Sequence, residues 1–216
     1  MKKVLITGSN GFIGKNLNVS LKHTEGVEVI EFDIEHDRDI LKEALRRSDF
    51  VFHLAGVNRP EKVEDFYIQN TELTQFIVEN LIDYGNLIPV VLASSTQAEL
   101  DNPYGKSKRI AESHIEKYIH IGGIGYIYRL TNVFGKWCRP DYNSVVATFC
   151  FNVANEKEIS VSDRSKEMHL VYVNDIIDEF KLLLTGKVQR PYKEILSVQP
   201  SYKISLGAIS DLIKSF

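Results

Sequence analysis

The stretch "KKVLITGSNGFIG", residues 2–14, decides the fold. Its apolar run ends at a glycine, which predicts a buried strand, and residues 12–22 predict the helix that follows. In between, Gly8 permits a tight turn, Gly11 lets backbone amides approach a pyrophosphate at the helix N-terminus, and Gly14 lets the helix pack closely on the strand. The stretch therefore predicts a dinucleotide-binding turn. Its expected cofactor contacts are Gly8, Asn10, Gly11, Phe12, Ile13 and Gly14.

Strands and helices alternate at short spacing along the rest of the chain. Apolar runs predict further strands at 27–32, 50–56, 88–95, 123–130 and 168–173. Helices are predicted at 37–49, 64–84, 103–117, 143–154 and 174–184. This alternation predicts an α/β fold, a Rossmann-like doubly wound parallel sheet with helices on both faces. We expect a dinucleotide-binding domain at 1–136 and a small C-terminal substrate-binding region at 137–216, with 169–184 returning to the main sheet.

The carboxyl ends of the predicted strands are where a ligand should bind, because open α/β sheets place their crevice there. This rule selects the segments 7–14, 33–37, 54–60, 93–97 and 130–136.

The composition excludes several classes of partner and site. A formal net charge of -3 gives no electrostatic reason to expect nucleic acid or an anionic membrane. No stretch reaches the ~20 apolar residues that span a bilayer, and the apolar run after Met1 is too short for a signal peptide, so a cytoplasmic protein is expected. Cys138 and Cys150 form no C-x-x-C pair and no histidine cluster accompanies them, so both are predicted to be packing residues and no metal site is expected.

The stretch "DNPYGKSKRIAE", residues 101–112, places Tyr104 four residues before Lys108. Pro103 suits the first position of a helix, so the two side chains should share one helix face. An ammonium beside a phenol stabilises the phenolate and lowers a pKa that is about 10 in free tyrosine. Reduction of a ketone needs a proton on oxygen as hydride reaches carbon, so Tyr104 is the predicted proton donor and Lys108 the cation that tunes it.

A third group should hydrogen-bond the carbonyl oxygen of the substrate. Ser95 is the first candidate, because it lies at a predicted strand end, and Thr96 is the second. Strand alternation points these two side chains to opposite sides, so only one of them should serve.

Motifs along nearly the whole chain resemble the extended short-chain dehydrogenase/reductases, the group that remodels nucleotide sugars. They are T-G-x-x-G-x-x-G at 7–14, "HLAG" at 53–56, "QNT" at 69–71, "SST" at 94–96, Y-x-x-x-K at 104–108 and "RLTNVFG" at 129–135. Within this family, "HLAGVNRP", "DNPYGKSK" and "FGKWCRPDYNSVVATFC" look most like the reductase domains of bifunctional capsular-polysaccharide enzymes.

The resemblance implies an activity. Such reductases use NADPH to reduce the C4 ketone of a UDP-2-acetamido-2,6-dideoxy-hexos-4-ulose, on the route to UDP-N-acetyl-L-fucosamine. The zinc cupin domain that accompanies them is not expected in this chain, which has no cupin-like histidine pattern. Relatives often pair through two long helices, here 64–84 and 103–117, so a homodimer is expected.

The resemblance also implies further site residues. The lysine of Y-x-x-x-K holds the nicotinamide ribose, and Asn70 matches an asparagine beside the active site. The remaining cofactor contacts are expected from Asp33, Leu54, Ala55, Gly56 and Asn70. The substrate contacts are expected from Ser95, Thr96, Asn58, Arg59, Asn132, Lys136 and Arg139, with Arg164 as a further cation. Met168 occupies a position where sugar-nucleotide relatives usually carry an arginine, and His53 and His169 are predicted to be core residues.

The sequence leaves the cofactor and the reaction with alternatives. Asp33 ends the second strand, where an acidic residue favours NADH, whereas the family resemblance favours NADPH; NADPH is the expectation and NADH the alternative. Dehydration is disfavoured, because Gln97 and Ala98 stand where dehydratases carry their Asp-Glu pair. A 4-epimerase remains an alternative. So does a catalytically silent dinucleotide-binding subunit, although such proteins commonly lose the tyrosine or the lysine.

Overall fold

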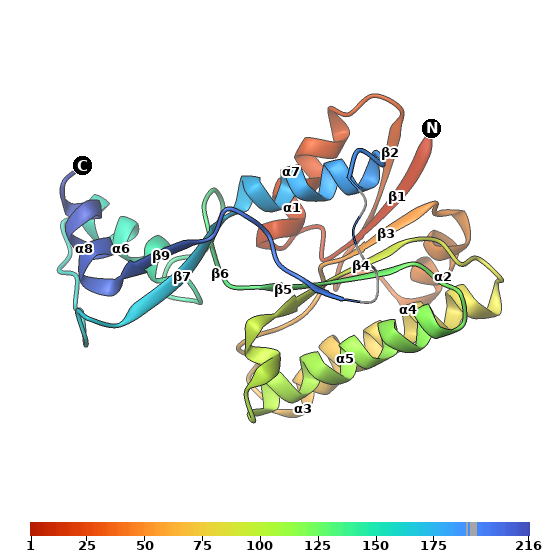
Figure 1. Cartoon of the computed structure of the whole chain (residues 1–216), viewed down its shortest axis with the longest axis horizontal. Coiled ribbons are helices and arrows are strands. Elements are labelled where there is room, and N and C mark those ends of the chain that lie inside the picture. Colours follow the sequence, from red (N-terminus) through yellow and green to blue (C-terminus); the bar gives the residue numbers. More distant parts are fainter. Residues whose placement is uncertain (189, 191–193) are drawn as a thin grey trace.

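The computed structural model describes residues 1–188, 190 and 194–216, and within them the main sheet has six parallel strands in the order β2-β1-β3-β4-β5-β8 (Figure 1). These strands are β1 (Lys2–Thr7), β2 (Val27–Phe32), β3 (Phe50–His53), β4 (Val90–Ser95), β5 (Gly125–Leu130) and β8 (Ile195–Leu196). Every pairing in this sheet is parallel, so the carboxyl ends of the strands lie along one edge. The predicted Rossmann-like α/β fold is confirmed.

Helices cover both faces of the main sheet (Figure 1). One face carries α1 (Phe12–Lys22) and α7 (Val173–Leu184), and the other carries α2 (Arg38–Arg47), α4 (Leu73–Asp83) and α5 (Pro103–His120). Successive strand residues point to opposite faces. Val4 and Ile6 accordingly lie in the core beneath α1 and α7, and Leu5 lies in the core beneath α2, α4 and α5.

The predicted helix at 64–84 has a different internal structure. It begins as α3 (Glu64–Phe66), continues as the π-helical turn η1 (Tyr67–Glu72) and ends as α4. In the π turn Asn70 and Thr71 are buried, with Asn70 Nδ2 donating to Ser107 Oγ and Thr71 Oγ1 donating to the Ser107 carbonyl. Single π turns are frequent at functional sites. Helical periodicity did not predict this one, because hydrogen bonds to α5 hold the two polar residues inward.

Helix α5 is the longest of the described helices, with 18 residues. Pro103 occupies its first turn and Asn102 Oδ1 accepts a hydrogen bond from Gly105 N at 2.7 Å, which caps the N-terminus. The helix extends three residues beyond the predicted end, to His120. Across the described part of the chain, no helix combines the length and the apolar character needed to cross a bilayer.

A second, three-stranded sheet lies beyond the carboxyl end of β5, beside the main sheet (Figure 1). It contains β6 (Asn132–Phe134), β7 (Glu167–Tyr172) and β9 (Tyr202–Ser205) in the order β6-β7-β9. Helices α6 (Val145–Ala154) and α8 (Leu206–Lys214) pack on it around a small core of Phe149, Leu170, Leu206 and Ile209.

The prediction that residues 169–184 return to the main sheet is wrong for the strand. β7 pairs with β6 and β9 in the small sheet, because the chain leaves β5 at Leu130 and β6 forms there almost at once. Only α7 returns, burying Ile176 and Phe180 in the core under α1. The sixth position of the main sheet belongs instead to β8, a two-residue strand that is too short to show in the sequence pattern. His169, expected in the core, is exposed on the small sheet.

Candidate active site

The glycine turn between β1 and α1 packs against the loop that follows β3. Gly8 has φ +70°, and a Cβ built on it would lie 2.7 Å from Ala55 Cα, so a larger residue is excluded by both conformation and space. A Cβ on Gly14 would lie 2.0 Å from the Gly8 carbonyl oxygen, as expected for a helix packed closely on the turn. Gly11 caps α1 without any side-chain hydrogen bond, which leaves the first amides of the helix for a phosphate. These residues fit the pyrophosphate of a dinucleotide.

Asp33 and Asn10, two predicted cofactor contacts, lie together at the ends of β2 and β1. Asp33 Oδ2 accepts a hydrogen bond from the Asn10 backbone N at 2.6 Å, and Asp33 Oδ1 accepts one from Ile34 N at 2.8 Å. Asn10 Nδ2 donates to Glu35 Oε1 at 2.8 Å. Asp33 therefore holds the glycine turn against the end of β2.

His53, at the end of β3, is a core residue as predicted. It is 1% exposed, and its ring nitrogens lie 2.7 Å from Thr7 Oγ1 and 2.9 Å from Thr74 Oγ1. Burial, helped by the charge of Lys108, lowers the pKa of His53 to about 3, so the ring is neutral at ordinary pH.

Tyr104 and Lys108 share a face of α5, as their spacing predicted. Lys108 Nζ lies 5.9 Å from the centroid of the Tyr104 ring and donates to the Ala93 carbonyl oxygen at 3.1 Å. Lys108 is 6% exposed, and burial, opposed by the charge of Glu112, lowers its pKa to about 8. An ammonium is thus held in a buried position beside the phenol.

The prediction that Lys108 lowers the pKa of Tyr104 is wrong for the protein alone. Burial raises the pKa of the Tyr104 hydroxyl, a hydrogen bond with Ser95 opposes this, and Tyr142 adds to it. The loss of hydration outweighs any attraction of the phenolate to the ammonium. The phenol therefore retains its proton at neutral pH.

Ser95, rather than Thr96, reaches Tyr104. The Ser95 side chain hydrogen-bonds the tyrosine and also accepts from Gln97 N at 3.2 Å, at the start of the 3₁₀ turn η2 (Thr96–Glu99). Thr96 is exposed. Of the two candidates, Ser95 is thus the one that lies beside the Tyr104 hydroxyl.

Asn70 fastens the loop after β3 to α5. Its Oδ1 accepts from Val57 N at 2.9 Å, and its Nδ2 donates to the Val57 carbonyl at 3.0 Å as well as to Ser107. Gly56 fits between this amide and Lys108, since a Cβ there would lie 2.6 Å from Asn70 Oδ1 and 3.2 Å from Lys108 Nζ. Asn58, which follows Val57, has a buried Oδ1 without a hydrogen-bond partner among the residues that the structure describes, as expected for a group that meets a ligand.

The predicted substrate residues after β5 have contacts of other kinds. Asn132 Nδ2 donates to the His169 carbonyl at 3.1 Å and joins β6 to β7. Lys136 lies over the Trp137 ring at 4.3 Å, and Arg59 and Arg139 are exposed. Arg164 pairs with Asp211 of α8 at 2.5 Å. The structure therefore brings together Ser95, Tyr104 and Lys108, and the contacts of these cations given above are with other residues.

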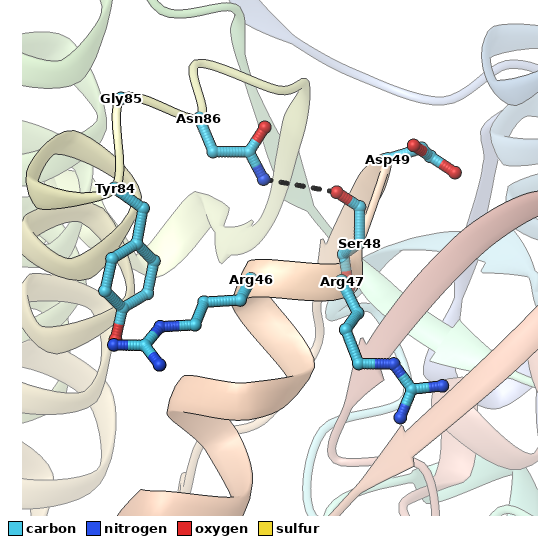
Figure 2. Close-up of a pocket in the computed structure, with 7 residues that line it drawn as sticks. All are labelled: Arg46, Arg47, Ser48, Asp49, Tyr84, Gly85 and Asn86. Atoms are coloured by element: carbon cyan, nitrogen blue, oxygen red, sulfur yellow. Dashed lines mark hydrogen bonds between the residues drawn. The ribbon is translucent and has the colours of Figure 1, made fainter.

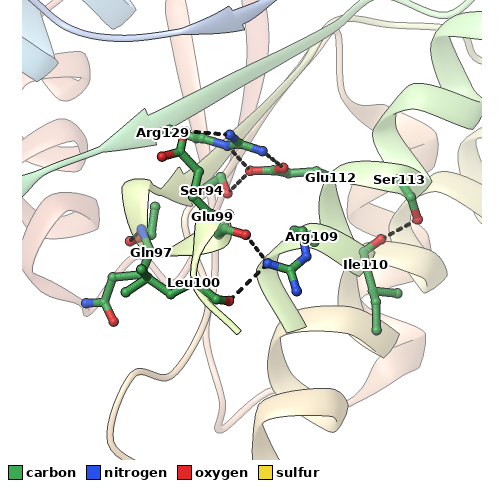
Figure 3. A network of polar contacts seen from close by, with 11 residues as sticks. Ser94, Gln97, Glu99, Leu100, Arg109, Ile110, Glu112, Ser113 and Arg129 are labelled. Carbon is green, nitrogen blue, oxygen red and sulfur yellow. Dashed lines mark hydrogen bonds and ion pairs between the residues drawn. The ribbon is translucent and has the colours of Figure 1, made fainter. Parts of the chain in front are cut away.

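A polar network beside Ser95 was not predicted (Figure 3). Its centre is Glu112 of α5, which is 3% exposed and accepts from Ser94 Oγ at 2.5 Å and from Arg129 of β5 at 2.7 and 2.9 Å. The available signal was the spacing: Glu112 follows Tyr104 by eight residues and Lys108 by four, so all three lie along one face of the helix.

A cavity of about 530 Å³ opens at the other edge of the main sheet (Figure 2). It is lined by Arg46, Arg47, Ser48, Asp49, Tyr84, Gly85 and Asn86. These residues precede β3 and β4 in the chain, at the amino ends of the strands, so the cavity is separate from the Tyr104 site.

The two cysteines lie in or beside the small sheet region and carry no disulfide. Cys138 is half-buried, Cys150 is exposed and both are free thiols. Among the residues that the structure describes, no three His, Cys, Asp or Glu side chains gather as a metal site would require.

The comparisons with known proteins agree with this geometry. A family model described as the NAD dependent epimerase/dehydratase family matches residues 4–198. The chain is 46% identical to UDP-2-acetamido-2,6-beta-L-arabino-hexul-4-ose reductase of Pseudomonas aeruginosa over 99% of its length, and 26% identical to GDP-6-deoxy-D-talose 4-dehydrogenase of Aggregatibacter actinomycetemcomitans over 87%. It covers 57% of the first of these relatives and 71% of the second.

Solved structures show the same fold. The capsular polysaccharide assembling protein CapF of Staphylococcus aureus matches with a TM-score of 0.86 and 40% identity, covering 97% of this chain and 57% of that one. UDP-glucuronic acid 4-epimerase of Bacillus cereus, solved with NAD, matches with a TM-score of 0.86 at 19% identity, covering 99% of this chain and 83% of that one. This chain thus spans a little over half the length of the two most similar proteins named here.

Proposed function

The chain belongs to the NAD dependent epimerase/dehydratase family, and we propose that it reduces the C4 ketone of a UDP-bound 2-acetamido-2,6-dideoxy sugar to an alcohol. The observation that carries this proposal is the Tyr104 hydroxyl, which is hydrogen-bonded to Ser95, has Lys108 beside its ring and lies at the carboxyl end of β4. The 46% identical relative is named as a reductase of such a sugar nucleotide. The product would be a precursor of capsular or other surface polysaccharide, on the route to UDP-N-acetyl-L-fucosamine.

A bound nicotinamide would supply the hydride, and side chains of this protein would donate the proton to the ketone oxygen. Tyr104 keeps its proton until the ketone oxygen becomes basic, because burial raises its pKa. The Ser95 hydroxyl orients that oxygen, and Lys108 stabilises the phenolate that remains once the proton has moved. The ribose of the cofactor would contact Lys108, and its pyrophosphate the amides after Gly11.

We propose NADPH as the cofactor, with NADH as the alternative. Asp33 was the argument for NADH, but both of its carboxylate oxygens accept hydrogen bonds from backbone amides of the chain. Its presence is therefore explained by the packing of the glycine turn, without a ribose hydroxyl. The family resemblance supports NADPH.

The substrate side of the site would be formed by residues 137–216 together with the loop after β3. Asn58, whose buried oxygen has no partner among the described residues, is the expected first contact, and the other expected contacts are Ser95, Thr96, Arg59, Asn132, Lys136 and Arg139. We place the reaction in the cytoplasm, where nucleotide sugars and NADPH are made.

We also propose a homodimer through η1, α4 and α5. Ile68 of η1, Ile82 of α4 and Ile110 of α5 are exposed, and so is Ile121, which follows α5. A second copy of the same helices would cover them.

The decisive experiment measures NADPH oxidation by the purified chain with and without a UDP-2-acetamido-2,6-dideoxy-hexos-4-ulose. We expect oxidation only with the sugar, one NADPH per alcohol formed, and a loss of about 10²–10⁴-fold in kcat for Tyr104→Phe, since a general acid contributes that much. Tyr84→Phe, which removes a tyrosine hydroxyl at the end of α4 and away from the Tyr104 site, is the control and should retain most of the rate. A sugar inverted at C4 with no net NADPH consumption would identify a 4-epimerase instead. Binding of NADPH without any turnover would indicate a silent subunit.

A further inference from the structure

The Glu112 network joins β4, β5, α5 and the 3₁₀ turn η2, and so includes the segments that carry Ser95, Tyr104 and Lys108. Ser94 and Arg129 are direct partners across β4 and β5, and Glu112 bridges them from α5 (Figure 3). Arg129 Nη1 also donates to Glu99 Oε1 at 3.2 Å, at the end of the 3₁₀ turn that starts after Ser95. The network therefore fixes the chain immediately before and after Ser95.

Stability alone is a weak reason for such a group. Removing a carboxylate from water costs several kcal/mol, and an ion pair in the interior only partly offsets this, so apolar residues of similar size often serve a fold as well. Here the carboxylate has its partners in place: a hydroxyl and two guanidinium nitrogens of Arg129. The position of the pair, one helical turn beyond Lys108, is what requires an explanation.

The surroundings of Lys108 contain little negative charge. Beside it on α5 are the protonated phenol of Tyr104 and the carboxylate of Glu112. From β3 it faces His53, which is neutral, and the groups that approach it from β4, η1 and the loop after β3 are the Ala93 carbonyl, Asn70 and Gly56. Glu112 is accordingly the anion that acts on the buried ammonium.

We propose that Glu112, held by Arg129, is a positioning residue: it fixes Ser95 against Tyr104 and supplies the negative charge that keeps Lys108 in its ammonium form. This inference rests on the proposed reductase function. Glu112 touches neither substrate nor cofactor in this proposal, and it acts only through Lys108 and the end of β4.

The matched control lies on the opposite face of the sheet. Glu179 of α7 accepts from Tyr128 OH at 2.7 Å and from Arg190 at 2.7 and 2.9 Å, so it has the same kinds of partner as Glu112. Tyr128 and Arg129 are neighbours on β5 and point to opposite faces. The two carboxylates thus differ chiefly in their distance from the proposed site.

The test compares Glu112→Gln with Glu179→Gln in the reductase assay across pH. Glutamine keeps an oxygen for Ser94, and Arg129 keeps its pair with Glu99, so folding should survive. We expect Glu112→Gln to shift the alkaline limb of kcat to lower pH by about one unit, and hence to lose about tenfold in rate above that limb, with KM for the sugar unchanged. Glu179→Gln should lower thermal stability and leave the pH profile in place. An unshifted profile in Glu112→Gln overturns the proposal.

Two further measurements keep the inference falsifiable. If Glu112→Gln does not fold, Arg129→Lys replaces it: a lysine keeps the charge but loses the two-point contact, and kcat should fall severalfold at constant KM, whereas an unchanged kcat contradicts the positioning role. If the wild-type chain has no turnover, the proposed function fails by itself. The pH dependence of NADPH binding, followed by Trp137 fluorescence, then tests Glu112 separately, since Lys108 is the proposed ribose contact: binding lost at lower pH in Glu112→Gln than in the wild type supports the inference, and identical titrations refute it.

Discussion

Helices α5 and α7 cover opposite faces of one sheet, and they bury different kinds of side chain against it (Figure 1). The buried residues of α7 are all apolar: Val173, Ile176, Ile177, Phe180, Leu183 and Leu184. Those of α5 include three polar side chains, Ser107, Lys108 and Glu112, and its later turns return to the apolar pattern with Ile115 and Tyr118.

The difference shows how the chain separates stability from chemistry. Apolar burial under α7 stabilises the fold by roughly 25 cal/mol per Å² of apolar surface removed from water. It requires only that the neighbouring side chains fit in shape. The first ten residues of α5 instead bury a charge on each of two side chains, and each needs a specific partner, Ala93 for Lys108 and Arg129 for Glu112. The costly groups are confined to the end of the helix nearest the carboxyl ends of the strands, where the ligand is expected.

The largest effect should come from a truncation under α7. Phe180 is fully buried and contacts the rings of Phe52 and Tyr128, so Phe180→Ala should lower the free energy of unfolding by about 3–5 kcal/mol. Because the ring contacts of Phe180 are with Phe52 and Tyr128 and not with Ser95, Tyr104 or Lys108, kcat measured well below the melting temperature should not change. Leu182→Ala, on the exposed face of the same helix, is the control and should cost less than about 0.5 kcal/mol in denaturant unfolding. A large loss of kcat in folded Phe180→Ala would break the comparison.

The charge buried under α5 should make activity and stability respond oppositely to pH. Because burial lowers the pKa of Lys108 to about 8, the wild-type kcat should fall as pH rises through about 8. The unfolded lysine, with its ordinary pKa of 10.5, stays protonated over the interval from 8 to 10.5, so there the unfolded chain binds more protons and the contribution of Lys108 to stability rises with pH.

This second prediction is measured as a difference, the unfolding free energy of wild type minus that of Lys108→Met at each pH. Subtraction removes the tyrosines, whose own titration begins in the upper part of the interval. If this difference in unfolding free energy does not change from neutral pH upward, folding does not lower the pKa of Lys108, and the prediction is wrong.

The smallest effect should be on the outer face of α5. Ile110 is 39% exposed, so Ile110→Lys should change folding stability by less than about 0.5 kcal/mol and leave kcat per chain unaltered. If the proposed dimer forms there, two added charges facing each other would shift the sedimenting species towards monomer. Leu212→Lys, on α8 and 53% exposed, is the matched substitution that should leave the mass unchanged. An identical mass for wild type and both variants would exclude a dimer through α5.

The features that sequence reasoning predicted depend on residues close together in the chain. The glycine spacing at 8, 11 and 14, the Asn-Pro start of α5 and the four-residue interval from Tyr104 to Lys108 are local patterns, and the structure reproduces each of them. The features that sequence reasoning missed depend on contacts between distant residues, or are too short to give a sequence pattern. β7 has an ordinary strand pattern that is silent about which sheet it joins, and β8 contains only two residues.

The amino-acid sequence by itself determined the alternation of strands and helices, the glycine turn and the shared face of Tyr104 and Lys108, because backbone sterics and the helical repeat act over a few residues. Only the tertiary structure decided the pKa values of Tyr104 and Lys108. It placed Tyr104, half-buried, beside Ser95, where the loss of hydration raises the pKa of the phenol, and it brought Glu112 and Arg129, from different elements, into contact around Ser94. Desolvation and long-range pairing exist only once the chain has folded, and so no local pattern contains them.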